Sequence, residues 1–212
     1  MVISVKKTMH TRFLALVLSA VLLLPALAGC SKKTGAEKDL AYPIDGEPVC
    51  LDPQIAADET AKLVTGNCFE GLVRLDESGA IVPGAAQRWD VSADGRTYTF
   101  HLREGMKWHI ADSDELEELL GKGKTIDTTL NAEDFAFGLK RALLPETGMA
   151  SAKALYAIEN AQAVHRGTAR SDQLGVRVVN ASTLEIRLAR ADSAFLYALT
   201  LPMSCLLYTS PS

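Results

Sequence analysis

The sequence predicts a mixed α/β fold, and three observations carry this prediction. The first is a pair of strand-like runs around a tight turn, over residues 89–108. The second is a capped helical pattern that begins at Asn131. The third is another pair of strand-like runs, over residues 174–179 and 183–188. Strands and helices that are interspersed along one chain are typical of the α/β class.

The length and charge of the chain restrict its function. The chain has 212 residues, which is enough for one or two domains with a real core, and a formal net charge of −4. Residues 1–29 contain three basic residues and no acidic one, so the rest of the chain carries −7. An acidic domain without a basic stripe is a poor ligand for nucleic acid, so we expect no nucleic-acid partner.

Residues 1–29 are typical of a bacterial lipoprotein signal peptide. Basic residues precede an apolar run over residues 13–24, and Leu27-Ala28-Gly29-Cys30 follows. This ending resembles a lipobox, which implies cleavage before Cys30 and acylation of its thiol. The acyl chains would hold the protein on a membrane surface, and residues 30–38 are predicted to form a flexible tether. The alternative is an uncleaved signal anchor.

The mature chain begins with two predicted elements and an irregular connection. Residues 40–44 are a candidate strand, and residues 57–68 are predicted to be a helix with Ala61, Val64 and Cys68 on one face. Two prolines and a glycine between these elements exclude regular structure. Asp52, within that connection, is expected to act as a turn or cap residue.

The hairpin over residues 89–108 has an aromatic inner face. Its turn is predicted at Ala93-Asp94-Gly95-Arg96, where glycine accepts positive φ without steric cost. Period-2 alternation places Tyr98, Phe100 and Leu102 on the buried face, and the first run adds Trp89 and Val91. We expect these aromatic rings to pack in the core rather than to stack on a ligand.

The second half of the chain predicts an insertion, two helices and two strands. Residues 112–120 are acidic and are expected to form a solvated surface insertion. Asn131 and Asp134 predict a variant capping box for the next helix, which Pro145 ends. A further helix is expected over residues 151–164. The buried positions that we predict here are Phe135, Leu139, Ala142 and Leu143 on the first helix, and Leu184, Ile186 and Leu188 on the last strand.

A last short helix is expected to follow the strands. Either Asp192 or Ser193 is predicted to cap this helix, which would run through Leu199.

Cys50 and Cys68 lie beyond the signal sequence, in a compartment that would be oxidising. A disulfide between Cys50 and Cys68 is therefore allowed, and it would contribute about 3 kcal/mol. The alternative is two separate buried thiols. No Cys-x-x-Cys motif occurs, and no histidine has ligand spacing from either cysteine, so we predict no metal site.

The chain contains none of the common catalytic motifs. There is no Gly-x-Ser-x-Gly elbow, P-loop, dinucleotide fingerprint or His-Glu-x-x-His sequence. We therefore predict no enzyme, no catalytic residues and no cofactor.

As a motif, the hairpin resembles the signature region of the family 5 extracellular solute-binding proteins, the oligopeptide- and dipeptide-binding receptors of ABC importers. The typical run is Trp-x-x-Ser-x-Asp-Gly-x-x-Tyr-x-Phe-x-Leu-Arg-x-x-x-Lys-Trp. It is matched by Trp89, Ser92, Asp94, Gly95, Tyr98, Phe100, Leu102, Arg103, Lys107 and Trp108. Further matches are Glu47 with Leu51, Asp52 and Pro53; Phe69-Glu70-Gly71-Leu72; Ala132, Asp134, Phe135, Lys140 and Arg141; and Gly175-Val176, Thr183-Leu184 and Leu188.

The resemblance implies a particular domain organisation. Residues 39–203 would form the N-terminal lobe of a type II periplasmic-binding-protein-like fold, with a β-rich subdomain over residues 68–164. Residues 204–212 depart from the family pattern, and the match implies a truncated protein.

The resemblance also implies a function. The protein would be the monomeric, lipid-anchored, extracytoplasmic receptor of an ABC importer at the bacterial cell membrane, in the periplasm or on the cell surface. It would capture a dipeptide or oligopeptide, close its lobes and dock on the permease subunits. Glu47, Val49 and Cys50 fall where the first lobe would touch the ligand backbone. With half a cleft, residues 30–203 are expected to bind no peptide alone.

Several alternatives to this function stay open. The chain could be a lipid-anchored surface sensor or adhesin on the same fold, without a transporter. It could also be part of a surface hydrolase whose catalytic residues lie elsewhere. Nickel and haem are alternative ligands to a peptide.

Overall fold

The computed structural model describes residues 42–108, 127–149 and 151–201. The chain divides into two units, one that ends at Pro43 and one that begins at Ile44, and the helices and strands described belong to the second unit. The predicted signal peptide (1–29), tether (30–38), acidic insertion (112–120) and atypical tail (204–212) lie outside the described residues.

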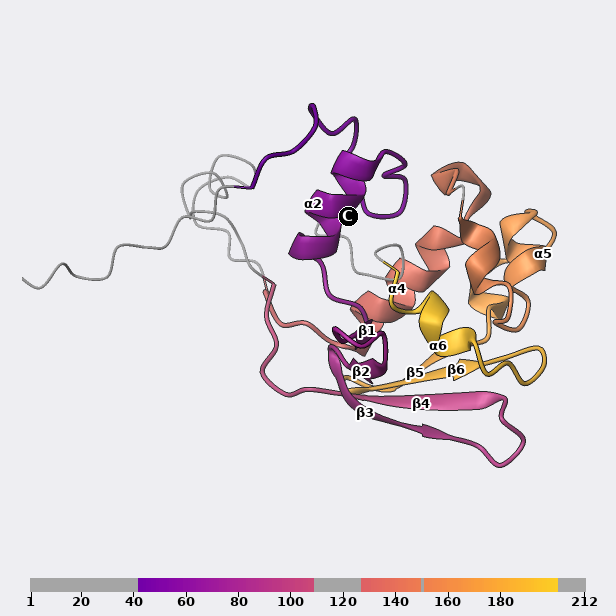
Figure 1. Ribbon diagram of the computed structural model, residues 1–212. Coiled ribbons are helices and arrows are strands. Elements are labelled where there is room, and N and C mark those ends of the chain that lie inside the picture. The colour runs from indigo at the N-terminus through magenta and orange to yellow at the C-terminus, as the bar shows by residue number, and fades with distance from the viewer. Residues whose placement is uncertain (1–41, 109–126, 150, 202–212) are drawn as a thin grey trace, which may run out of the picture. The chain divides into compact units, whose positions relative to one another are not determined.

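A four-stranded antiparallel sheet forms the base of this unit (Figure 1). Its order is β3-β4-β6-β5, with bounds β3 Ala86–Val91, β4 Thr97–Leu102, β5 Val176–Asn180 and β6 Thr183–Arg187. A smaller sheet pairs β1 (Val73–Leu75) with β2 (Ile81–Pro83). The helices cover one face of the large sheet (Figure 1), so the predicted mixed α/β class is confirmed.

The β3–β4 hairpin is confirmed, with Trp89 opposite Phe100. Gly95 adopts φ +67° in the turn and donates its N–H to Ser92 O over 2.8 Å. The side chains of Tyr98, Phe100 and Leu102 are buried, as the alternation predicts. Val91, however, is 47% exposed, because it ends an edge strand and has no neighbouring strand on its outer side.

Helix α4 (Ala132–Ala142) also follows the prediction. The Asn131 side chain accepts the Glu133 N–H over 2.7 Å, and the Asp134 carboxylate accepts the Asn131 N–H over 2.8 Å. Both bonds of the capping box are therefore formed. The helix packs against β5 and β6, and its predicted apolar positions are buried: Phe135, Leu139, Ala142 and Leu143. A 3-10 turn, η1 (Pro145–Thr147), follows at the proline.

The continuous helix predicted over residues 151–164 is wrong. The structure has a 3-10 turn η2 (Ala152–Leu155) and a short helix α5 (Ala161–His165), separated by turns around an isolated bridge of Ile158 with Leu188. In the segment between them, the Glu159 N–H donates to Arg187 O, and the Ala189 N–H donates to Ala157 O, both over 2.9 Å. The backbone groups of this segment thus bond to residues at the end of β6 instead of forming the hydrogen bonds of a continuous helix. Asn160, at φ +63°, then starts α5.

The second strand pair and the last helix agree with the sequence. Strands β5 and β6 pair antiparallel, and Leu184, Ile186 and Leu188 are fully buried. The 3-10 turn η3 (Ser171–Gln173) precedes β5, and helix α6 (Phe195–Ala198) follows β6. The predicted cap at Asp192 or Ser193 is wrong, because the N-cap of α6 is Ala194 and has no side-chain cap; the Asp192 carboxylate instead accepts the Ala194 N–H over 2.9 Å, before the helix. Strand β4 lies before the predicted subdomain boundary at residue 164 and pairs with β6, which lies after it. The boundary stays a prediction.

The N-terminal elements differ from the prediction in two ways. Residues 42–44, the described part of the candidate strand, form no strand. Helix α2 (Glu59–Cys68) is present, but it buries Ala61 and Thr65, and Cys68 is exposed. Thr65 can be buried because its hydroxyl donates to Ala61 O over 2.8 Å within the helix.

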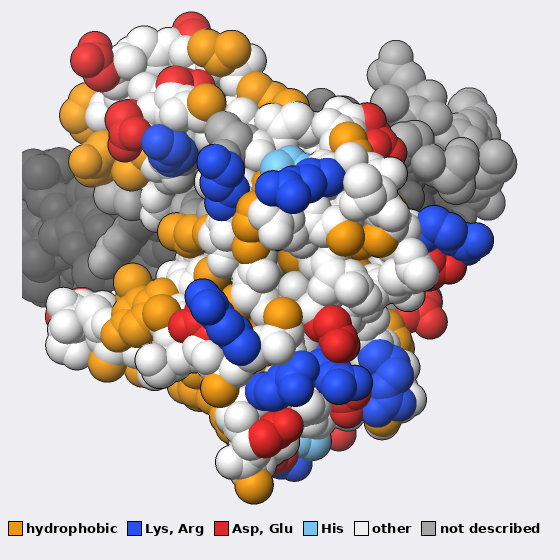
Figure 2. Space-filling model, turned by 90° about the vertical axis from the view of Figure 1, so that its right-hand side faces the viewer, with side chains coloured by type: hydrophobic (Ala, Val, Ile, Leu, Met, Phe, Trp, Pro, Cys, Tyr) orange, Lys and Arg blue, Asp and Glu red, His pale blue; other side chains and the backbone are white. Residues whose placement is uncertain are grey.

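Acidic and basic side chains lie interspersed on the face shown in Figure 2. Among the described residues, ion pairs include Arg177 with Glu185 over 2.9 Å and Arg187 with Glu159 over 3.4 Å. Pairs this exposed contribute little to stability. Among the described helices, none is both long and apolar enough to cross a membrane.

Candidate functional site

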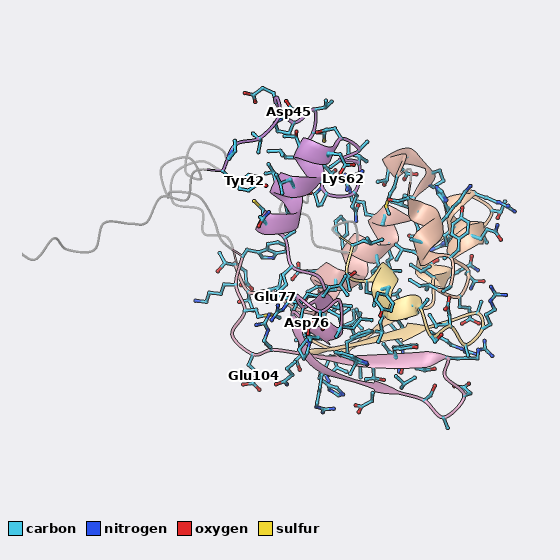
Figure 3. All side chains as sticks on the ribbon, viewed as in Figure 1. Tyr42, Asp45, Lys62, Asp76, Glu77 and Glu104 are labelled. Atoms are coloured by element: carbon cyan, nitrogen blue, oxygen red, sulfur yellow. The ribbon has the colours of Figure 1, made fainter. Side chains whose placement is uncertain are left out.

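The candidate ligand segment, residues 46–51, precedes helix α2 and has no helix or strand. Two of the three predicted ligand contacts, Glu47 and Val49, are exposed, and the Val49 side chain is 89% exposed. Cys50 is half-buried. Figure 3 labels Asp45, just before this segment, and Lys62 on α2. The structure therefore places all three residues together on one surface loop.

The loop is tied at Val49 to the start of α2 through Asp58. The Val49 N–H donates to Asp58 Oδ2 over 3.3 Å, and the Ala61 N–H donates to Asp58 Oδ1 over 2.8 Å. The Ala61 N–H bond is the largest of the effects that lower the pKa of Asp58, and the Val49 bond acts in the same direction. The carboxylate is thus charged at neutral pH and serves as both helix cap and loop anchor. A second tie joins Thr60 Oγ1 to Asp45 O over 3.0 Å.

Asp52 joins the end of the loop to helix α4. Its carboxylate accepts two bonds from the Arg141 guanidinium, Nη2 to Oδ2 over 2.6 Å and Nη1 to Oδ1 over 3.3 Å. Both side chains are mostly buried. Asp52 is also the predicted turn residue, since its Oδ1 accepts the Gln54 N–H over 3.0 Å and its backbone carbonyl accepts the Ala56 N–H over 2.8 Å.

Gln54 completes this arrangement and was not identified from the sequence. Its side chain is buried, its Oε1 accepts from Arg141 Nη1 over 2.6 Å, and its Nε2 donates to Gly138 O over 2.7 Å. We call Asp52, Gln54 and Arg141 the Arg141 cluster. Asp52 and Arg141 each stood out in the sequence as matches to the same family, but a separation of 89 residues gave no sign that they touch.

The two cysteines are free thiols in the structure, so the disulfide that the sequence allows is not formed there. Cys50 Sγ accepts the Asp52 N–H over 3.4 Å, and Cys68 is exposed at the end of α2. The arrangement is that of two separate thiols, of which Cys68 is not buried. Among the described residues, no group of three His, Cys, Asp or Glu side chains could hold a metal ion.

Two grooves lie beside the turn that follows α2, and both are lined by Cys68, Phe69 and Glu70. One has a volume of about 410 Å³ and continues along β1 to Thr200. The other, about 370 Å³, is also lined by Arg103, which donates to Glu70 over 2.6 Å, and by Trp108. Neither groove includes the three predicted ligand contacts.

Two histidines lie among the described residues, and each bonds a neighbouring side chain. His101 bonds Asp90 over 2.8 Å on the polar side of β4, and His165 Nδ1 bonds the Tyr156 hydroxyl over 2.7 Å. The partners of the two imidazoles are a carboxylate and a phenol, and neither bond involves a serine or cysteine nucleophile.

Comparisons with known proteins agree with this description. The profile of the bacterial extracellular solute-binding proteins, family 5 Middle, matches residues 80–207. The chain is 31% identical over 177 residues to the dipeptide-binding protein of Lactococcus lactis subsp. cremoris, covering 84% of this chain and 29% of that protein. It is 40% identical over 177 residues to the periplasmic murein peptide-binding protein MppA of Escherichia coli, covering 82% and 30%.

Solved structures show the same fold. The murein tripeptide binding protein MppA of Escherichia coli matches with a TM-score of 0.65 and 36% identity, over 77% of this chain and 29% of that one. The pheromone receptor PrgZ matches with a TM-score of 0.65 and 32% identity, over 78% and 30%. The chain thus spans about three tenths of the length of these relatives.

The matched family consists of solute-binding proteins that perform no chemistry, in line with the lack of a catalytic motif in the sequence. The profile covers more than half of the chain, and the fold agrees with it. The chain therefore belongs to the family 5 bacterial extracellular solute-binding proteins.

Proposed function

We propose that this chain supplies the N-terminal lobe of a lipid-anchored receptor that captures short peptides for an ABC importer. The observation that carries the proposal is the shared fold and sequence of a murein tripeptide binding protein. A dipeptide-binding relative supports the same ligand class. Oligopeptides and dipeptides are the ligands, and the ABC permease subunits are the partners.

The candidate ligand segment suits an extended peptide. Glu47 and Val49 are exposed, and the segment has no strand partner, so its backbone can bond to the backbone of a ligand. The Glu47 carboxylate adds a negative charge that attracts the ammonium group of a peptide. Contacts to the backbone of a peptide do not depend on its side chains, so they favour binding of peptides with many different sequences.

In this proposal the protein acts outside the cytoplasm, as a monomer held by acyl chains on Cys30. The anchor keeps the receptor near the permease, and the flexible tether over residues 30–38 lets the folded lobe reach the permease surface. Capture closes the two lobes around the peptide, and the closed form docks on the permease. The chain itself performs no chemistry.

Calorimetry tests the ligand class. The protein encoded by the complete reading frame is titrated with dipeptide to pentapeptide pools, with nickel and with haem. We expect micromolar binding of a peptide pool and none of nickel or haem. We expect residues 30–203 alone to bind no peptide, because the family places much of the cleft in a second lobe. A protein that binds only nickel or haem would refute the peptide assignment.

A second candidate is a peptide sensor without transport, and the likeness to a pheromone receptor favours it. The two functions differ in the fate of the captured peptide. Uptake of a labelled peptide should fall when the gene is deleted if the protein serves an importer. Unchanged uptake together with a lost transcriptional response to peptide would support the sensor.

A further inference from the structure

We propose that the Arg141 cluster is a positioning device that fixes the candidate ligand segment before a ligand arrives. The part of the proposal that concerns peptide affinity rests on the proposed function. The part that concerns the order of the segment stands on contacts within the described residues.

The segment needs an anchor because it cannot stabilise itself. It contains Gly46 at φ +91° and a proline, and no ladder of hydrogen bonds runs along it. A free loop of this kind would lose conformational entropy each time a ligand ordered it, and that loss would weaken binding. An anchor that is formed in the unliganded protein removes this cost.

Arg141 can fix two loop side chains at once. Its guanidinium bonds both oxygens of Asp52 and the side-chain oxygen of Gln54. The planar fork of arginine fits this geometry, whereas the ammonium group of lysine does not. Gln54 also bonds the Gly138 carbonyl, so the loop is held at two points of α4. Helix α4 packs on the central sheet, which makes it a rigid support.

The Arg141 cluster lies close in sequence to the predicted ligand contacts and restrains them directly. Asp52 lies two residues after Cys50 and donates its N–H to the sulfur of that residue. The N-terminal end of the segment is held independently, by the bond from Thr60 Oγ1 to Asp45 O, and Val49, next to Cys50, by the bond from its N–H to Asp58. Loss of the Arg141 cluster should therefore free the C-terminal side of the segment while α2 and the sheet stay folded.

Hydrogen exchange tests the positioning directly, without a ligand. The amide N–H groups of Gln54, Ile55 and Ala56 donate hydrogen bonds to Asp52. In Arg141→Gln, we expect these amides to exchange about tenfold faster or more. Arg177→Gln is the matched control, because it removes another two-bond arginine–carboxylate pair, with Glu185 on the sheet. Exchange in residues 46–56 should not change in the control. Equal exchange in both variants would overturn the proposal.

Two further variants separate a positioning role from a general loss of stability. Arg141→Lys keeps the positive charge but loses the planar guanidinium that bonds two partners. The amides of Gln54, Ile55 and Ala56 should therefore exchange as fast in this variant as in Arg141→Gln. If Arg141→Gln does not fold, Asp52→Asn, which keeps the turn acceptor and removes the charge, gives the same readout. In either variant a melting temperature close to that of the control, with fast exchange only in residues 46–56, supports positioning.

Peptide affinity provides the second readout, in the protein encoded by the complete reading frame. We expect Arg141→Gln to bind the best peptide pool about tenfold more weakly, and Arg177→Gln to bind it unchanged. If the wild-type protein binds no peptide, the proposed function fails, while the exchange experiment still decides the positioning. If the wild type and Arg141→Gln bind peptide equally, the cluster does not position the segment for binding and the proposal is overturned.

Discussion

The ring of Phe195 in α6 meets the ring of Tyr98 in β4 edge to face, with centroids 5.1 Å apart and planes at 61°. The Tyr98 hydroxyl also donates to Asp192 O over 3.3 Å. These contacts join the hairpin to a segment almost a hundred residues later. The aromatic face that the sequence predicts is therefore part of the core and not a ligand platform.

Removal of the Phe195 ring should be among the most destabilising changes in the chain. Phe195 is 1% exposed, so Phe195→Ala leaves a cavity against Tyr98 and should cost about 3–5 kcal/mol in the free energy of unfolding. Tyr197→Ala, on the exposed side of the same helix, should change it by about 0.5 kcal/mol or less. Urea unfolding measures both, and equal effects would contradict the packing described.

The ionisation of Tyr98 gives a pH test of the same contact. Burial, and after it the charge of Asp192, raises the pKa of Tyr98 above its ordinary value of 10.0. The folded state therefore favours the neutral phenol. This contribution to stability is present below pH 10 and is lost as the pH rises through the folded pKa. Tyr98→Phe should flatten the alkaline fall in stability, and an unchanged alkaline profile would refute the assignment.

The Asn131 cap should contribute measurably to α4. Asn131→Ala removes the side-chain acceptor of the Glu133 N–H, which should cost about 1 kcal/mol. Asn131→Asp keeps an acceptor at the same place and should cost far less. Thermal melts of the two variants make the comparison, and equal melting temperatures would show that the cap has no energetic role.

Asp58 should make the start of α2 sensitive to acid. The Ala61 N–H bond is the first cause of the lowered pKa of Asp58, whose ordinary value is 3.8. The stabilisation is thus present above about pH 3.8 and is lost as the pH falls through the lower folded pKa. Exchange of the Ala61 and Val49 amides should accelerate in that range. In Asp58→Asn, which keeps an acceptor but does not titrate, the acceleration should disappear.

Two glycine substitutions should have opposite signs. A Cβ at Gly175 would lie 2.5 Å from Arg187 O and 2.9 Å from the Glu159 side chain, so Gly175→Ala must displace the backbone beside β6. We expect a loss of about 1–3 kcal/mol. A Cβ at Gly66 meets nothing within 4 Å inside α2, so Gly66→Ala should stabilise by about 0.5–1 kcal/mol. Urea unfolding of the two variants decides it.

The thiols of Cys50 and Cys68 should react separately. Both are free in the structure, and Cys68 is the more exposed. We expect both to be alkylated without reductant, Cys68 faster, as measured by mass spectrometry of the peptides that contain them. Protection of both residues until a reductant is added would instead show the disulfide that the sequence allows.

Local pattern was sufficient where neighbouring residues decide the structure. The Asp94-Gly95 turn, the box at Asn131 and Asp134, and the alternation that ends at Leu102 each lie within a few residues, and each is confirmed. The helix predicted over residues 151–164 failed because Glu159 bonds to Arg187, which no local pattern indicates. Gln54 was missed for the same reason, since its partners lie on α4.

The sheet order has a consequence for the synthesis of this protein. Strand β4 has β3 on one side as soon as the hairpin forms, but its other side waits for β6, which ends at Arg187. During translation a nascent chain that stops short of Arg187 therefore presents the bare edge of an aromatic strand. Such an edge invites pairing with other chains, so a holding chaperone should matter most to this protein at that stage.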